Sequence, residues 1–264
     1  KNCKNKGNLK VISESLDNLS YELCGITSYA KSMENCSNSG NITIVNTEKN
    51  DPEYGPALTA CGVIGECRKK ITGCSNTGNI SVTNKGGKKS TTRATIAGVF
   101  SSSAKAASRC YNTGNISYKG ACTDYSLDKA IWVQGVGTGY GTSECYNTGK
   151  ITVKLTSGTA CVGGVSYAGR KLKNCYNTGA VSLTGNGQIG GIAAEFYDGY
   201  SNYNTGKISG KGKTLYKGEI AGNAGYSYLD GVTVYDNYYT GSGKKSGSES
   251  TSWKPYQSKA KKVS

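Results

Sequence analysis

The sequence predicts an all-β fold in which the chain winds into a parallel β-solenoid of about seven rungs. Three observations predict it: a short motif recurs along the chain, a second motif recurs between its copies, and 264 residues include 38 Gly and 20 Tyr. A unit of roughly 30 residues cannot bury its own apolar face, so neighbouring units must stack.

The first motif has the form Cys-x-Asn-x-Gly and is followed by alternating apolar and polar residues. In the segment 79–82, Ile80 and Val82 point to one side and the Asn and Ser to the other, as in a strand. We interpret Asn-Thr-Gly as a turn in which Gly supplies a positive φ. The copies begin at Cys3, Cys36, Cys74, Cys110, Cys145, Cys175, Asn202 and Asn237.

The second motif reads apolar-x-Gly-apolar. Its glycines are Gly25, Gly62, Gly98, Gly135, Gly164, Gly191 and Gly222. The connection from each of these glycines to the next unit is nearly constant, whereas the connection that precedes it varies in length. Length variation of this kind predicts variable loops on one side of a stacked array. A helical or leucine-rich repeat is less favoured, because Leu is sparse and no period of 3.6 residues runs through the units.

The variable loops are the segments in which we expect recognition residues. Their ranges are 44–59, 83–94, 118–131, 154–160, 184–187 and 210–218. The acidic and aromatic residues in them are Asp51, Glu53, Tyr54, Asp124, Tyr125 and Asp128. No calcium-loop pattern of alternating Asp residues accompanies these carboxylates.

Stacking in register turns each motif position into a ladder. The cysteines of the first position predict a column of structural thiols in a narrow corner: after Cys3 they are Cys36, Cys74, Cys110, Cys145 and Cys175. The third position predicts asparagines that bond from rung to rung: after Asn5 they are Asn38, Asn76, Asn112, Asn147, Asn177 and Asn204.

The remaining five cysteines are the ones among which disulfide bonds are most expected. They are Cys24, Cys61, Cys67, Cys122 and Cys161. Cys24 and Cys61 each precede a glycine of the second motif, so we expect them to be neighbours.

Two sets of surface residues are candidate ligand sites. The second motif position carries Tyr111, Tyr146, Tyr176, Tyr203 and Tyr238, which would form either a platform for sugar rings or plain surface cladding. The constant connection carries Arg68, Lys69, Lys70, Lys105, Arg109, Arg170, Lys171 and Lys173. These cations would form a basic stripe interrupted at 138–144, or else solvated turns.

The net charge of +15, from 32 Lys and Arg against 17 Asp and Glu, favours an acidic partner. The sequence has no His, which excludes Ser-His-Asp and Cys-His catalytic pairs and His-containing zinc sites. It has no Cys-x-x-Cys pair and no run of 18 apolar residues. We therefore expect no cofactor, no metal, no nucleic acid partner and no membrane span.

The repeats divide the chain into a solenoid domain, 1–243, and a Ser- and Lys-rich segment, 244–264, which we interpret as a cap remnant, linker or tail. The first unit begins at its own motif, and no signal peptide is visible. We expect a mature product or a fragment of a longer protein, with another segment or chain covering that first rung.

The Cys-Tyr-Asn-Thr-Gly unit with its downstream apolar-x-Gly-apolar motif resembles the GLUG-type repeats of large bacterial surface proteins. Such repeats occur in adhesins and in the non-catalytic part of some IgA-peptidase-like proteins. The resemblance covers about residues 1–243 and implies a right-handed β-solenoid outside a bacterium, often a Gram-positive anaerobe. The long inserts of the early units depart from the pattern, and neither a protease motif nor a sortase motif is present.

These observations favour a non-catalytic, extracellular or cell-surface bacterial repeat protein that acts as an adhesin, stalk or assembly module. Its partners would be a host or cell-surface glycan or protein, or an anionic wall polymer. One alternative is a filament or matrix subunit that associates end to end. Another is a β-helix carbohydrate-active enzyme or glycan-binding module, although the carboxylates that an enzyme needs are scattered over different rungs.

Overall fold

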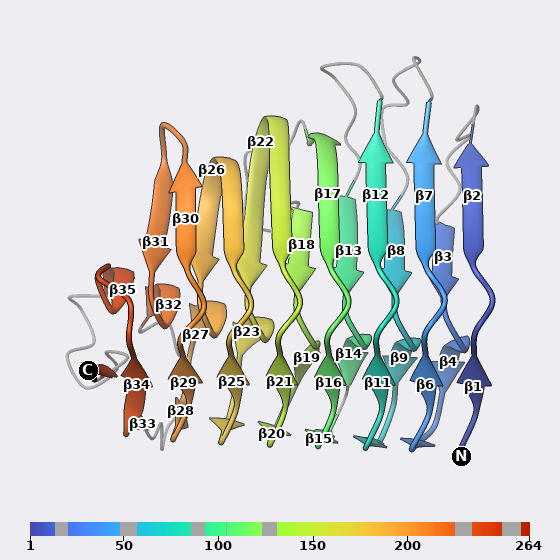
Figure 1. Cartoon of the computed structure of the whole chain (residues 1–264), viewed down its shortest axis with the longest axis horizontal. Helices are drawn as coiled ribbons and strands as arrows, with labels where there is room; N and C mark the ends of the chain where they lie inside the picture. Colours follow the sequence, from blue (N-terminus) through green and yellow to red (C-terminus); the bar gives the residue numbers. More distant parts are fainter. Residues whose placement is uncertain are drawn as a thin grey trace.

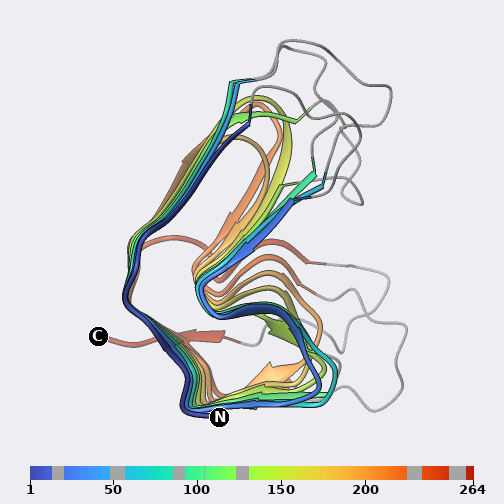
Figure 2. The ribbon, with the colours of Figure 1, turned by 90° about the vertical axis from the view of Figure 1, so that its right-hand side faces the viewer.

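The chain forms a right-handed parallel β-solenoid, as the sequence predicts (Figures 1 and 2). The structure is a computed structural model and describes residues 1–13, 21–47, 57–85, 93–103, 105–122, 131–224, 234–249 and 260–264. Within these ranges the chain has no helix, and its strands pair in parallel with the equivalent strands of neighbouring rungs. Figure 1 shows the rungs side by side, and Figure 2 shows one rung behind another from the N-terminal end.

Two flat sheets form the lower left corner of the cross-section in Figure 2: the floor along the bottom and, rising from it, the sheet that the first motif forms. The motif sheet consists of β1 (Lys4–Asn5), β6 (Ser37–Asn38), β11 (Ser75–Asn76), β16 (Tyr111–Asn112), β21 (Tyr146–Asn147), β25 (Tyr176–Asn177), β29 (Tyr203–Asn204), β34 (Asn237–Tyr239) and β36 (Ala260–Lys262). The floor sheet precedes it in each rung and consists of β5 (Met33–Glu34), β10 (Lys70–Thr72), β15 (Ala106–Ser108), β20 (Thr142–Ser143), β24 (Leu172–Lys173), β28 (Gly199–Tyr200) and β33 (Val234–Tyr235).

The upper sheet folds over on itself and forms the upper lobe in Figure 2. Its ascending strands are β2 (Leu9–Ser13), β7 (Ile42–Asn46), β12 (Ile80–Asn84), β17 (Ile116–Ala121) and β30 (Ile208–Lys211). Its descending strands are β3 (Tyr21–Cys24), β8 (Ala57–Cys61), β13 (Arg93–Ala97), β18 (Ile131–Gln134) and β31 (Leu215–Gly218). Two long strands, β22 (Ile151–Gly163) and β26 (Val181–Gly190), belong to both limbs and join them into one sheet.

A shelf leads from the descending limb back to the floor. It consists of β4 (Thr27–Ala30), β9 (Ile64–Cys67), β14 (Phe100–Ser103) and β19 (Thr138–Gly139), and then of β23 (Ser166–Gly169), β27 (Ala193–Phe196), β32 (Ala221–Ala224) and β35 (Ser246–Glu249). The shelf meets the descending limb at an angle, so this side of the solenoid is concave (Figure 2).

The cross-section holds two separate hydrophobic cores. The upper core fills the folded upper sheet with side chains such as Ile44, Ile80 and Ile116. The lower core lies between the shelf, the floor and the motif sheet and contains Phe100, Phe196 and the motif cysteines. A narrow waist separates the two cores, and it is here that the two sequence motifs meet.

At the waist, each glycine of the second motif lies against a motif asparagine. A Cβ atom on Gly98 would lie 2.7 Å from Cβ of Asn112, and one on Gly135 would lie 2.7 Å from Cβ of Asn147. Both would also collide with the carbonyl oxygen of the glycine on the next rung. The same contact recurs for Gly25, Gly62, Gly164 and Gly191. The second motif therefore needs Gly because two walls of the solenoid touch there.

The motif asparagines form a continuous buried ladder. Asn112 is fully buried, and its Nδ2 donates both to the carbonyl oxygen of Gly114, at 2.8 Å, and to Oδ1 of Asn147, at 2.8 Å. Each asparagine thus closes its own turn with one N–H and reaches the next rung with the other. The ladder runs through Asn5, Asn38, Asn76, Asn112, Asn147, Asn177 and Asn204 with amide-to-amide distances of 2.7–2.9 Å.

The glycine of Asn-Thr-Gly does not adopt a positive φ, so our reason for its presence was wrong. A Cβ atom on Gly114 would instead strike the carbonyl oxygen of Gly78 on the preceding rung. The left-handed residue is the one directly before the first motif position. Its occupants are Asn2, Asn35, Gly73, Arg109, Glu144, Asn174, Ser201 and Asp236, with φ between 49° and 62°.

The last copy of the second motif also needs correction. Strand pairing aligns Gly190 with Gly218 and Ala193 with Ala221, which places Glu219, and not Gly222, at the position equivalent to Gly191. Glu219 is buried, and its carboxylate accepts hydrogen bonds from Nδ2 of Asn204 at 3.4 Å and from the Gly243 amide at 2.9 Å. This carboxylate ends the amide ladder where a glycine would have left it open.

The length variation lies between the ascending and descending strands of the upper sheet, as predicted. β7 ends at Asn46 and β8 begins at Ala57, whereas β22 and β26 each run through both limbs without a break. The candidate recognition residues Asp51, Glu53, Tyr54, Asp124, Tyr125 and Asp128 lie outside the described residues. Within 244–264, β35 pairs with β32 and β36 pairs with β34, so these strands extend the shelf and the motif sheet.

We expect Gly135→Ala to lower the free energy of unfolding by about 3 kcal/mol, because backbone from two walls must move to admit a methyl group. Gly141→Ala is the matched control, since its Cβ would meet only the Lys105 carbonyl oxygen, at 3.8 Å. Urea unfolding followed by circular dichroism measures both. Equal stabilities for the two variants would contradict the waist contact.

We expect Asn112→Ala to cost about 3 kcal/mol, because it leaves Oδ1 of Asn147, an N–H of Asn76 and the Gly114 carbonyl without their partner. Asn115→Ala is the control: its side chain is exposed and accepts one hydrogen bond, from the Lys150 amide at 3.0 Å. Water can replace that bond, so this variant should lose less than about 1 kcal/mol. A larger loss for Asn115→Ala would show that burial of the ladder is not what matters.

Candidate functional site

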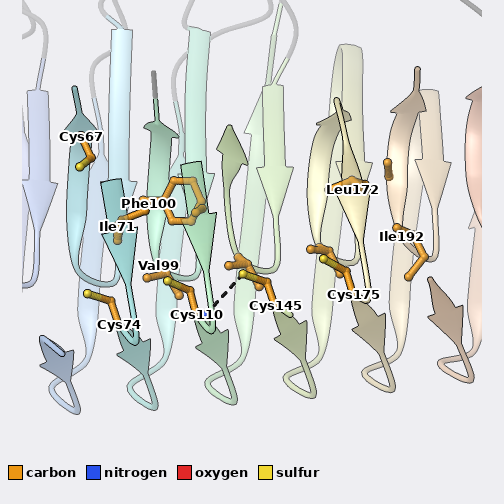
Figure 3. Close-up of a cluster of buried hydrophobic side chains, with 14 of the residues drawn as sticks. Cys67, Ile71, Cys74, Val99, Phe100, Cys110, Cys145, Leu172, Cys175 and Ile192 are labelled. Atoms are coloured by element: carbon orange, nitrogen blue, oxygen red, sulfur yellow. Dashed lines mark hydrogen bonds between the residues drawn. The ribbon is translucent and has the colours of Figure 1, made fainter. Parts of the chain in front are cut away.

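The motif cysteines form a buried column in the lower core (Figure 3). Each thiol donates a weak hydrogen bond, at 3.2–3.5 Å, to the carbonyl oxygen two residues earlier, across the left-handed residue; the donors are Cys36, Cys74, Cys110, Cys145 and Cys175. The thiol is small and apolar enough to pack there, and it also bonds the turn. At Asn202 and Asn237 the column continues through an amide hydrogen bond of 2.9 Å.

None of the eleven cysteines, all of which lie in described segments, forms a disulfide bond. Cys24 and Cys61 are register partners on β3 and β8, as the sequence indicates. Burial, together with the neighbouring Cys24 thiol, raises the pKa of Cys61 well above its ordinary value. The Cys61 thiol is therefore protonated at neutral pH.

The candidate tyrosine platform lies on the outer surface of the motif sheet. The rings of Tyr111 and Tyr146 stack at 4.9 Å between centroids and 2° between planes, and those of Tyr146 and Tyr176 at 4.7 Å and 3°. Tyr203 and Tyr238 follow in register on β29 and β34. Because successive rings cover each other's faces, Tyr146 presents its edge and hydroxyl group to solvent. Within this stack a sugar ring therefore finds no open face on Tyr146.

The candidate basic residues lie along the turn from shelf to floor and on the floor itself. One group contains Arg68, Lys69, Lys70, Lys105 and Arg109, and the other contains Arg170, Lys171 and Lys173. The rung of β20 lies between the two groups and carries Tyr140 and Glu144 where the preceding rung carries Lys105 and Arg109. This is the interruption of the basic stripe at 138–144 that the sequence predicts. Two of these cations are engaged locally: Arg68 Nε lies 3.8 Å from a carboxylate oxygen of Glu66, and Lys173 Nζ lies over the ring of Tyr200.

A further candidate site lies in the concave side of the solenoid, on the outer surface of the shelf. It is a hollow of about 390 Å³, and its walls come from β9, β14, β19, β23 and β27 and from the turns that follow them. We call it the shelf groove; it is lined by Glu66, Ser102, Ser103, Thr138, Gly139, Tyr140, Tyr167, Ala168, Arg170, Glu195 and Tyr197.

A buried glutamine holds the inner wall of the shelf groove. Gln134 is fully buried at the end of β18, and its Nε2 donates to the carbonyl oxygen of Ser101 at 2.8 Å. Its Oε1 accepts from Oγ1 of Thr138 at 2.7 Å and from the amide of Tyr167 at 3.2 Å. One side chain thereby ties the descending limb to β14, β19 and β23, which keeps the angle between limb and shelf rigid.

Aromatic rings and one arginine form the outer part of the groove. The Arg170 guanidinium lies 5.3 Å from the ring centre of Tyr140 on the preceding rung and 5.3 Å from that of Tyr197 on the following rung. Beside them, Trp132 stacks on Tyr167 at 5.6 Å over the buried pair Cys161 and Ala194. These cation–π and stacking contacts orient side chains that would otherwise rotate freely.

A carboxylate lies among these rings. The Tyr197 hydroxyl donates to Oε2 of Glu195 at 2.6 Å. Burial and the adjacent Glu195 raise the pKa of Tyr197, and burial and Glu195 also raise the pKa of Tyr167. Both phenols therefore keep their protons, and Tyr197 acts as a hydrogen-bond donor.

Sequence reasoning found only Arg170 among these residues. The others do not recur from rung to rung, so the alignment of repeats hides them. A weak signal was available, since Trp132 lies three residues before Gly135 and Tyr167 three residues after Gly164, on the two strands that flank the waist.

In the described parts of the chain, no three His, Cys, Asp or Glu side chains gather where they could hold a metal ion. A search of the same residues reveals no helix with the length and hydropathy needed to cross a membrane. Comparison with protein-family models, with curated proteins and with solved structures found no match.

We expect the free energy of unfolding to fall as the pH rises above about 8.5, the ordinary pKa of a thiol. Burial raises the pKa of Cys61 and of Cys161, so the folded chain keeps protons that the unfolded chain releases. Urea unfolding at about pH 7 and about pH 10 measures the change. Replacing both residues with Ala should flatten the pH dependence, and an unchanged slope would contradict the assignment.

Proposed function

We propose that this chain is a non-catalytic module of a bacterial cell-surface or secreted protein and that it acts as an adhesin, stalk or assembly module. The resemblance to GLUG-type repeats supports the extracellular, bacterial part of this proposal. Its partner would be a host or cell-surface glycan or protein, or an anionic wall polymer.

The observation that carries the proposal is how each rung divides its residues. The repeated Asn and Cys side chains contact their own copies on neighbouring rungs, and the repeated Gly residues let the two walls of the solenoid touch. Residues that differ from rung to rung, such as Trp132 on the descending limb and Tyr140 and Arg170 in the turns that follow shelf strands, lie on the outer surface. A stiff repeated interior with a variable outer surface is the arrangement of a scaffold that presents binding residues.

The carboxylates of the shelf groove do not form an obvious acid–base pair. Glu66 is exposed and close to Arg68, and Glu195 accepts a hydrogen bond from the Tyr197 hydroxyl group. These arrangements favour contact with a ligand over general acid–base chemistry, for which one carboxyl group would have to stay protonated near neutral pH.

An adhesion assay tests the proposal. Beads coated with the whole chain should adhere to immobilised host-cell glycoproteins, extracellular matrix or bacterial cell wall more strongly than beads coated with an unrelated protein of similar net charge. The charge-matched control is needed because a net charge of +15 attracts any acidic surface. Adhesion no greater than that of the control on every surface would overturn the binding role.

A separate assay tests the proposal that the chain is not an enzyme. Soluble polysaccharides incubated with the protein should show no new reducing ends and no new unsaturated products. Release of either would identify an enzyme instead. End-to-end association, the alternative partner arrangement, would show as particles that grow with concentration in sedimentation velocity.

A further inference from the structure

The shelf groove has the dimensions and lining of a small-ligand site. Its volume of about 390 Å³ lies within the range of 300–1,000 Å³ that is usual for such sites. It spans several rungs, from Glu66 on β9 to Tyr197 after β27. A ligand that lies along the solenoid axis would therefore contact residues of successive rungs.

The aromatic rings in this groove differ from the stacked tyrosines of the motif sheet. Tyr140 is 60% exposed and has Arg170 on its next-rung side, whereas Tyr146 lies between two parallel rings. Trp132 and Tyr167 are half-buried and form a second apolar surface beside the first. Partly exposed aromatic surfaces with polar groups at their margins suit the alternation of C–H faces and hydroxyl edges in a pyranose ring.

The polar groups of the groove are suited to hydroxyl groups. Glu195 supplies carboxylate acceptors, Arg170 supplies guanidinium donors, and Ser102 adds a hydroxyl group that both donates and accepts. Glu195 and Arg170 are oriented by contacts with Tyr197, so neither has to be ordered anew when a ligand binds.

The charged residues of the shelf groove also limit the class of sugar that can bind there. Although the whole chain is strongly basic, this groove holds two carboxylates, Glu66 and Glu195, against Arg170, while Arg68 is paired with Glu66 outside its lining. With Arg68 and Arg170 beside Glu66 and Glu195, the charges in the groove and at its edge balance, so an acidic sugar gains no net attraction there, whereas an uncharged sugar meets donors and acceptors without a charge of its own to be matched.

We propose that the shelf groove binds an uncharged oligosaccharide, with its pyranose faces against Tyr140 and Tyr167 and its hydroxyl groups bonded to Glu195 and Arg170. This inference rests on the proposed function as a surface-binding module and names the ligand class. The binding site is thus an aromatic groove built from non-repeated residues, and the tyrosine stack and the basic stripe lie outside it.

Isothermal titration calorimetry on the whole chain tests this site. The probes are tetrasaccharides of glucose, mannose, galactose and N-acetylglucosamine, with tetragalacturonate as the anionic comparator, each at up to millimolar concentration. At least one uncharged tetrasaccharide should bind, more tightly than tetragalacturonate, and its affinity should change little when salt is raised. Binding of none of the uncharged probes, or tighter and salt-sensitive binding of tetragalacturonate, would overturn the proposal.

Two surface variants locate the site. Tyr140→Ala removes an exposed ring from the groove and should weaken binding about tenfold or more, while Tyr176→Ala, which removes a 38% exposed ring from the motif sheet, should leave it unchanged. Glu195→Gln should also weaken binding, because the amide accepts hydrogen bonds less strongly than the carboxylate. The reverse pattern, with loss in Tyr176→Ala and none in Tyr140→Ala, would place the ligand on the tyrosine stack and refute the groove.

The outcomes separate this inference from the proposed function. Beads that adhere while no tetrasaccharide binds would refute the uncharged-sugar groove and leave the adhesive role standing. Tetrasaccharide binding that Tyr140→Ala abolishes, in a protein whose beads do not adhere, would support the groove and refute the adhesive role.

Discussion

The contact between a motif asparagine and a motif glycine across the waist is the constraint on which the rest of the structure depends. The two walls approach so closely there that only a residue without Cβ fits on one side. The opposite wall needs a side chain that can form hydrogen bonds with its equivalents on both the preceding and the following rung. Asn does so with one amide, and the pairing of these two residue types explains why both motifs recur together in the sequence. It also divides the interior into two cores, each narrow enough for modest side chains to fill.

The shape of the outer surface follows from the same waist. Where the descending limb turns at the glycine and becomes the shelf, the solenoid must be concave, and the residues on either side of the turn face a common space. Gln134 fixes this angle at the middle rungs through bonds to Ser101, Thr138 and Tyr167. The shelf groove is therefore a product of the repeated architecture, although the residues that line it are not repeated.

Much of the interior could be predicted from the sequence, because ladders follow directly from the alignment of repeats. Aligning the repeats was enough to predict the parallel all-β fold, the side on which the connections vary in length, and the pairing of Cys24 with Cys61. The left-handed position could not be predicted, because residue types that rarely adopt this conformation, such as those at Arg109, Glu144 and Ser201, occupy it as well as Asn and Gly. The last glycine was misassigned because the segment around Gly222 imitates the motif, while Glu219 fills the equivalent place.

The candidate site was less predictable for a physical reason. A repeated Tyr predicts a ladder, but whether its rings show faces or edges depends on torsion angles, and stacking between Tyr111 and Tyr176 hides both faces of Tyr146. The groove residues come from different offsets on several rungs, and only the three-dimensional turn at the waist brings Tyr140, Arg170 and Tyr197 together. The thiol column has a consequence of another kind. Cys3 is exposed, and the cysteines that follow it in the column are sealed by the rungs on either side. A thiol reagent reaches these cysteines only when neighbouring rungs separate. The order in which the cysteines react therefore reports the order in which the rungs unfold.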